Sequence, residues 1–115
     1  MRGNIDASLR IKAGDNTVVL ARGWIEFGPD DPDTVEVWVG VGQGKNAATG
    51  SGVYGSGWLT VARPAAGSSP KTTWQCDAET DDPLGYKPGQ GDAGAVVIGD
   101  TIDPYPWGRD VTLKN

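Results

Sequence analysis

The 115-residue sequence contains no histidine and only one cysteine, Cys76. Without histidine, the Ser-His-Asp triad, the Cys-His pair and histidine-ligated metal catalysis are all excluded. A single cysteine cannot form an internal disulfide, which excludes the disulfide-stapled class of small domains. We therefore predict that the protein is not an enzyme and needs no cofactor. A pair of loop carboxylates acting as in glycosidases is the remaining catalytic alternative.

Positive charge and long apolar runs are also scarce. Ten Lys and Arg residues are scattered along the chain against fifteen Asp and Glu residues, which gives a net charge of −5. No basic patch is available for phosphates, so we predict no nucleic-acid partner. No apolar run is long enough for a transmembrane span or a signal-peptide core, so we predict no membrane insertion. The compartment stays open, and a virion or an extracellular or cell-surface location suits such a chain best.

Glycine and proline, by contrast, are abundant, with 18 and 8 residues. They divide the chain into short segments, of which residues 34–42 are the clearest. Val35, Val37, Val39 and Val41 occupy every second position there. Because successive strand residues point to opposite faces, this alternation predicts a strand with one buried face.

Six further segments show a similar alternation or a short apolar run. We predict strands over residues 5–12, 17–27, 34–42, 53–62, 72–78, 93–99 and 110–114. The segments between them, including residues 40–52 and 100–108, are predicted to be loops, and no window has a convincing helical period. Seven short strands separated by Gly- and Pro-rich loops predict a single domain over residues 1–115. Its expected fold is all-β, an antiparallel two-sheet β-sandwich.

One element of this pattern is similar to a known group of folds. Tyr-Lys-Pro-Gly at residues 86–89 leads into Ala-Gly-Ala-Val-Val at residues 93–97, and Trp74 falls on an inward strand face. With seven strands, this combination resembles the immunoglobulin-like β-sandwiches of bacterial exported and phage-borne proteins. The resemblance spans most of the chain and implies a fold, an immunoglobulin-like sandwich of about seven strands, but no function.

Tryptophan is frequent, with five residues in the chain. Trp24, Trp38 and Trp58 each lie on the polar face of their predicted strand, with Tyr54 four residues before Trp58, whereas Trp74 lies on a core face. If the three strands are neighbours, these four aromatic residues form one exposed binding surface. The alternative is that a loop or the other sheet covers the rings, since a one-residue register slip exchanges the two faces.

Two functions would use such a surface. Our lead hypothesis is a non-catalytic structural or interaction module that docks onto a larger protein assembly, as a virion or cell-surface accessory subunit does, or that self-associates. Tryptophan and tyrosine are common anchors of protein interfaces. The alternative is a carbohydrate-binding module in which Trp24, Trp38 and Trp58 form a stacking platform for a glycan.

Acidic residues cluster in the predicted loops. Asp30, Asp31 and Asp33 are weak calcium candidates, because Ca²⁺ needs several oxygen ligands that converge. Their spacing does not match the twelve-residue EF-hand loop. Solvated loop carboxylates are the simpler interpretation, so we predict no metal site.

Overall fold

The computed structural model describes residues 1–44, 52–99 and 102–115, without the side chains of residues 102–105. Its strands are β1 (Arg2–Ile5), β2 (Ser8–Ile11), β3 (Val18–Glu26), β4 (Thr34–Gln43), β5 (Val53–Ala62), β6 (Lys71–Glu79), β7 (Gly89–Gly99) and β8 (Ile102–Lys114). The described residues contain no helix, and so none that is long and apolar enough to cross a membrane.

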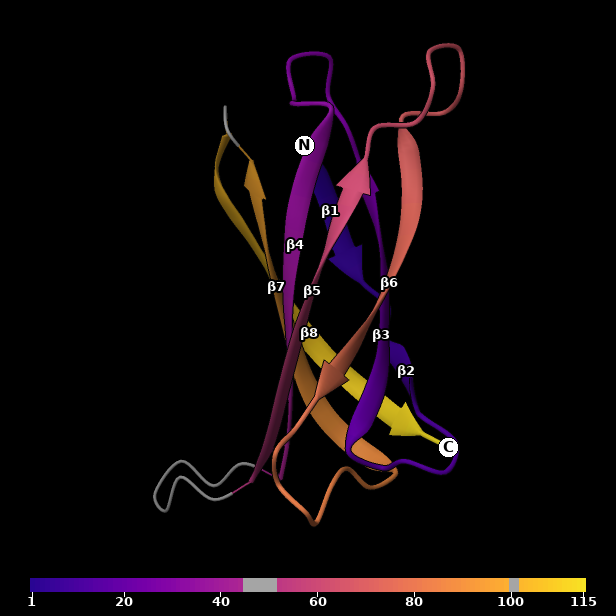
Figure 1. The fold of residues 1–115 in the computed structure, drawn as a ribbon, viewed down its shortest axis with the longest axis vertical. Coiled ribbons are helices and arrows are strands. Elements are labelled where there is room, and N and C mark those ends of the chain that lie inside the picture. Colours follow the sequence, from indigo (N-terminus) through magenta and orange to yellow (C-terminus); the bar gives the residue numbers. More distant parts are fainter. Residues whose placement is uncertain (45–51, 100–101) are drawn as a thin grey trace.

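The strands form one sheet that closes on itself (Figure 1). Around the closed sheet the order is β3, β2, β8, β7, β4, β5 and β6, and β6 pairs again with β3. All neighbours are antiparallel except β2 and β8, which are parallel. The fold is therefore a seven-stranded β-barrel. The predicted two-sheet, immunoglobulin-like β-sandwich is wrong, because the pairings of β2 with β8 and of β5 with β6 join what would have been separate sheets.

Most strand predictions agree with the structure, and the exceptions are the first strand and the starts of the last two, of which β7 begins at Gly89 and not at the predicted residue 93. The first predicted strand, residues 5–12, is two strands in the structure. Strand β1 begins earlier, at Arg2, and ends at Ile5, and β2 follows after a break at Asp6 and Ala7; both pair with β3. Strand β8 begins at Ile102, well before the predicted residue 110. Prolines 104 and 106 are tolerated there because, among the described residues, this part of β8 pairs with β7 alone and its other edge carries no ladder. Strand β4 continues to Gln43, into the predicted loop at 40–52, and residues 45–51 of that prediction lie outside the described part.

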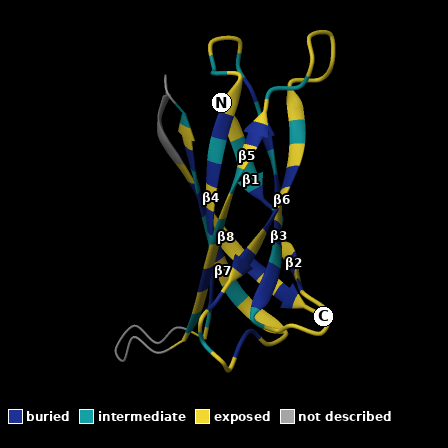
Figure 2. Cartoon of the chain, viewed as in Figure 1, coloured by how far each residue is buried: buried dark blue, intermediate teal, exposed yellow. Residues whose placement is uncertain are grey.

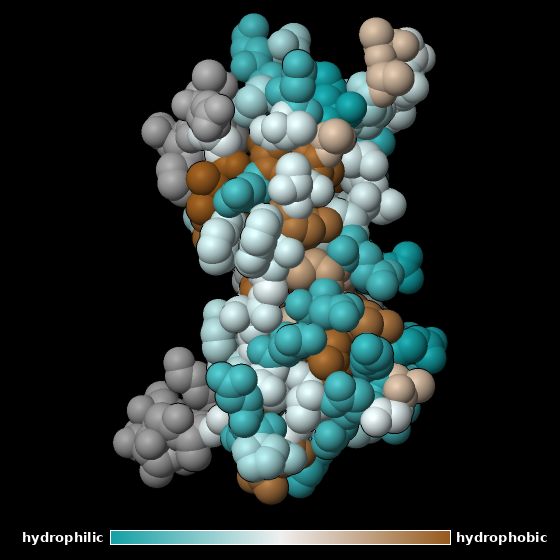
Figure 3. Space-filling view, in the orientation of Figure 1, coloured by the Kyte–Doolittle hydropathy of each residue, from teal (hydrophilic) through white to brown (hydrophobic). Residues whose placement is uncertain are grey.

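The barrel is elongated, with principal extents of 45 × 29 × 20 Å, and it narrows near mid-length (Figure 3). Buried and exposed residues alternate along the strands (Figure 2). Side chains fill the interior, as expected for a barrel of this size. All four valines of the β4 alternation point inward and are at most 3% exposed. The half-buried strand predicted from them is confirmed.

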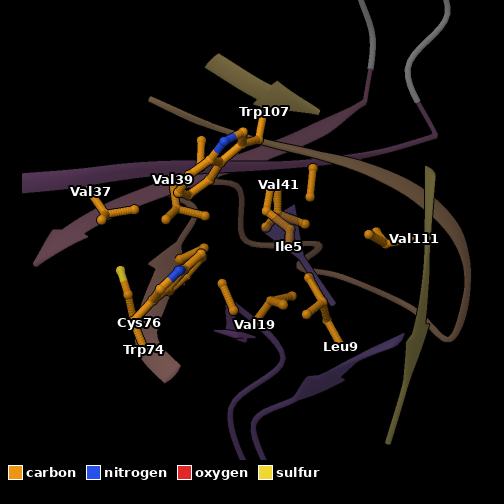
Figure 4. Packing of buried hydrophobic residues seen from close by; sticks show 14 of the residues in the cluster. Ile5, Leu9, Val19, Val37, Val39, Val41, Trp74, Cys76, Trp107 and Val111 are labelled. Atoms are coloured by element: carbon orange, nitrogen blue, oxygen red, sulfur yellow. The ribbon is translucent and has the colours of Figure 1, made fainter. Parts of the chain in front are cut away.

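Two tryptophans fill much of the interior (Figure 4). Trp74 on β6 and Trp107 on β8 are 4% and 9% exposed. Each ring lies against a glycine, because a Cβ atom on Gly23 would come within 2.5 Å of Trp74 Cζ2, and one on Gly3 within 2.5 Å of Trp107 Cη2. The absence of a side chain at these glycines is what makes room for the two indoles.

The pairing between β5 and β6 is the shortest in the closed sheet, because among the described residues only Ser56 and Glu79 are partners. Gly55 and Gly57, on either side of Ser56 in the chain, occupy inward positions, whereas Ser56 points outward. A Cβ atom on Gly57 would collide with the Asp77 carbonyl oxygen, and one on Gly55 with the Tyr86 hydroxyl. Alternating glycines on β5 therefore allow β6 to approach closely enough to close the sheet.

Candidate binding site

The outer wall of β4 and β5 carries a pair of stacked tryptophans. Trp38 and Trp58 are direct cross-strand partners, and the inward valines on β4 force Trp38 outward. Their ring centroids are 5.8 Å apart, with an angle of 20° between the ring planes. Trp38 is 47% and Trp58 57% exposed. The predicted exposure of both rings is confirmed, and the stack holds the two rings in a defined orientation.

A second contact orients Trp38. Its Nε1 donates a hydrogen bond to Glu36 Oε2 at 3.0 Å, from the same outer face of β4. This bond occupies the polar edge of the indole, so the apolar ring surface remains available to a ligand.

Tyr54 on β5 lies on the same outer wall as the tryptophan pair. It is 67% exposed, as predicted, and it pairs in register with Gly42. Its ring leans over Gly40, where a Cβ atom would lie 3.0 Å from Tyr54 Cε2 and still closer to the phenol end. We call Trp38, Tyr54 and Trp58 the aromatic face.

A groove of about 410 Å³ opens beside the aromatic face, across β4, β5, β7 and β8. We call it the aromatic groove. Its lining residues are Trp38, Val39, Gly40, Tyr54, Ser56, Asp92, Gly94, Ala95, Val96, Pro106 and Trp107. Apolar rings and polar side chains therefore share one concave surface, which is the usual composition of a small-ligand site.

Trp24, the fourth residue of the predicted surface, lies elsewhere. It belongs to β3. Around the barrel, β5 and β6 lie between β3 and β4 in one direction, and β2, β8 and β7 lie between them in the other. Lys71 Nζ lies 4.4 Å and Arg2 Cζ 5.9 Å from the centroid of the Trp24 ring. The structure thus brings Trp38, Tyr54 and Trp58 together and leaves Trp24 partly buried under two cations on the opposite wall.

Sequence reasoning missed the polar and glycine residues of the aromatic groove, including Ser56, Asp92 and Gly94. One signal was available, since Gly40 and Gly94 are both outward positions in otherwise regular strands. The two glycines pair directly across β4 and β7, but the sequence does not reveal that these strands are neighbours. The sequence does not identify Trp107 as a core residue, because its Pro-rich segment at residues 100–108 predicts a loop.

The acidic loop after β3 serves local structure. Asp31 Oδ2 accepts a hydrogen bond from the Gly28 N–H at 2.6 Å and lies 3.3 Å from the N-terminal ammonium group. Asp33 Oδ1 lies 3.5 Å from Arg63 Nε. Of the three calcium candidates Asp30, Asp31 and Asp33, two therefore use their carboxylates in contacts within the protein. Within the described ranges, no three His, Cys, Asp or Glu side chains are arranged to hold a metal ion.

Cys76 is an inward residue of β6 and is 8% exposed. Burial raises the pKa of its thiol, and the charge of Asp77 raises it further. The thiol therefore stays protonated at neutral pH, which makes it a poor nucleophile.

The chain matches no protein-family model, no curated protein and no solved structure. The geometry of the aromatic face and its groove is therefore the basis for a function.

Proposed function

We propose that this protein is a non-catalytic binding module whose ligand contacts the aromatic face. The observation that carries the proposal is the contrast between Trp38, Tyr54 and Trp58, which are 47–67% exposed, and Trp74 and Trp107, which are at most 9% exposed. Burying one large apolar side chain is worth about 1.5–3 kcal/mol. Three adjacent exposed rings thus offer a ligand several kcal/mol of binding free energy.

The chemistry of the site supports a binding role over a catalytic one. Among the described residues that line the aromatic groove, Asp92 alone carries a carboxylate, whereas glycoside hydrolysis generally uses two. The chain has no histidine, and its one thiol is buried with a raised pKa. These features leave the groove without a nucleophile and base pair.

Two ligand classes were predicted from the sequence, a protein assembly and a glycan. The exposed rings suit either class, because both interfaces use aromatic anchors. Attachment to a virion or a cell surface stays a prediction. The groove beside the rings is the feature that separates the two classes.

A test that needs no knowledge of the ligand is fragment mapping by NMR. Indole, phenol and methyl glucoside are titrated into ¹⁵N-labelled protein, and the indole N–H signals of the tryptophans are followed. We expect fragments to shift the signals of Trp38 and Trp58, assigned from the Trp38→Phe and Trp58→Phe variants. Trp74 serves as the internal control, since it is buried and does not line the aromatic groove.

The proposal is wrong if no fragment shifts Trp38 or Trp58, or if the shifts concentrate on residues of the opposite wall. Sedimentation velocity of the same samples detects self-association. A dimer that dissociates in the Trp58→Ala variant would make a second copy of the chain the ligand of the aromatic face.

A further inference from the structure

We infer that the aromatic groove binds a neutral glycan, with Trp38 and Tyr54 as stacking surfaces and Asp92 and Ser56 as hydrogen-bonding groups. This inference depends on the proposed function and specifies its ligand. The shape, the polar groups and the charge of the groove each support it.

The shape of the groove suits a narrow chain. Its volume of about 410 Å³ lies toward the lower end of the range of small-ligand sites. Gly94 lies in its floor, where an added Cβ atom would meet only the Trp107 carbonyl oxygen, at 3.5 Å, so no side chain there keeps a ligand from the backbone. At its cross-strand partner Gly40, the Tyr54 ring occupies the corresponding space. A protein partner could cover the exposed rings without entering such a hollow.

The aromatic lining provides a surface for the apolar face of a sugar ring. The C–H groups of a pyranose carry slight positive charge, and the faces of aromatic rings carry slight negative charge. Trp38 and Tyr54 line the groove, while Trp58 does not. Trp58 instead stacks on Trp38 and therefore acts as a positioning residue for it.

Sugar hydroxyl groups need hydrogen-bond partners close to the stacking surface. Asp92 supplies carboxylate oxygens and Ser56 a hydroxyl within the same lining. The Asp92 carboxylate lies over Gly42, where a Cβ atom would be 3.1 Å from Oδ1 and 3.4 Å from Oδ2. A larger residue than glycine at position 42 would push this carboxylate away. A hydrogen bond from a hydroxyl group to an ionised carboxylate is stronger than one between two neutral groups.

The charge of the site indicates a neutral ligand. The described lining residues include no lysine or arginine, and Asp92 faces exposed Asp110 directly across β7 and β8. The net charge of −5 repels polyanions as well. Sulfated, phosphorylated and uronic-acid polymers are therefore disfavoured.

The test is affinity electrophoresis in native gels containing hydroxyethyl cellulose, xyloglucan, galactomannan, laminarin or amylopectin, with heparin as the anionic comparison. We expect at least one neutral polysaccharide to retard the protein and heparin to leave its mobility unchanged. The Trp38→Ala and Tyr54→Ala variants should each bind at least about tenfold more weakly.

Asp92→Ala and Asp110→Ala form a matched pair. Each removes one carboxylate from the same cross-strand pair, so both relieve the same repulsion and change the net charge equally. Asp92→Ala should weaken binding about tenfold, and Asp110→Ala should leave it unchanged, because Asp110 does not line the groove. Far-UV circular dichroism confirms that each variant is folded.

Retardation by none of the five neutral polysaccharides would overturn the glycan inference, as would equal binding by the two aspartate variants or retardation by heparin alone. If fragments nevertheless shift Trp38 and Trp58, the binding module stands and only the ligand class is wrong. If neither fragments nor polysaccharides bind, the proposed function is overturned together with the glycan.

Discussion

Replacing Trp74 by alanine should destabilise the protein far more than replacing Trp38. Trp74 is 4% exposed, and its ring is enclosed closely enough to require glycine at position 23. Truncating a buried tryptophan costs about 3–5 kcal/mol through lost contacts and the cavity left behind. Trp74 Nε1 has no hydrogen-bond partner among the described residues, so its removal also relieves an unpaired donor. We therefore expect a loss toward the lower end, about 3 kcal/mol.

Replacing Trp38 by alanine should lower the free energy of unfolding by less, because 47% of this side chain is already exposed. Its main packing contact is the stack on Trp58, and an aromatic pair contributes about 0.5–1.5 kcal/mol beyond area burial. The hydrogen bond to Glu36 is exposed and adds little, since water replaces it. We expect a total loss of about 1–2 kcal/mol for Trp38→Ala.

The assay is urea denaturation followed by far-UV circular dichroism. A domain of this size has an m-value of about 1–3 kcal/mol/M and a total stability of roughly 6–17 kcal/mol. The Trp74→Ala midpoint should therefore fall by at least about 1 M, and the Trp38→Ala midpoint by clearly less. Equal losses, or a larger loss for Trp38→Ala, would refute the assignment of Trp38 to the outer face and Trp74 to the interior.

Three further predictions use the same assay. A double-mutant cycle on Trp38→Ala and Trp58→Ala should give a coupling of about 0.5–1.5 kcal/mol, whereas Trp38 and Trp24 should couple by less than about 0.5 kcal/mol because they lie on opposite walls. Gly57→Ala should destabilise by about 1–3 kcal/mol, since its methyl group would meet the β6 backbone; a neutral result would show that the barrel does not close tightly there. Burial raises the pKa of Tyr86 to about 12, so the unfolded chain ionises first, near pH 10. Stability should fall as the pH rises from about 10 to 12, by less in Tyr86→Phe, and an identical pH dependence in both proteins would contradict the burial of this hydroxyl.

Local patterns in the sequence predicted most strands and the direction of their side chains. The alternation along residues 34–42 places Val35, Val37, Val39 and Val41 inside the barrel and Trp38 outside it, and the structure confirms both. Trp58, Tyr54 and Trp74 also face as predicted. These features are predictable because a strand exposes alternate residues on alternate faces, whatever it pairs with.

Only the tertiary structure decided which strands are neighbours. The same alternation suits a sandwich and a barrel, so it could not reveal that β2 pairs with β8 or that Gly55 and Gly57 let β5 meet β6. For the same reason it could not separate Trp24 from Trp38 or assemble a groove from four strands. The direction of a side chain depends on its own backbone, whereas its neighbours depend on pairings between distant segments, and in this protein those pairings create the site.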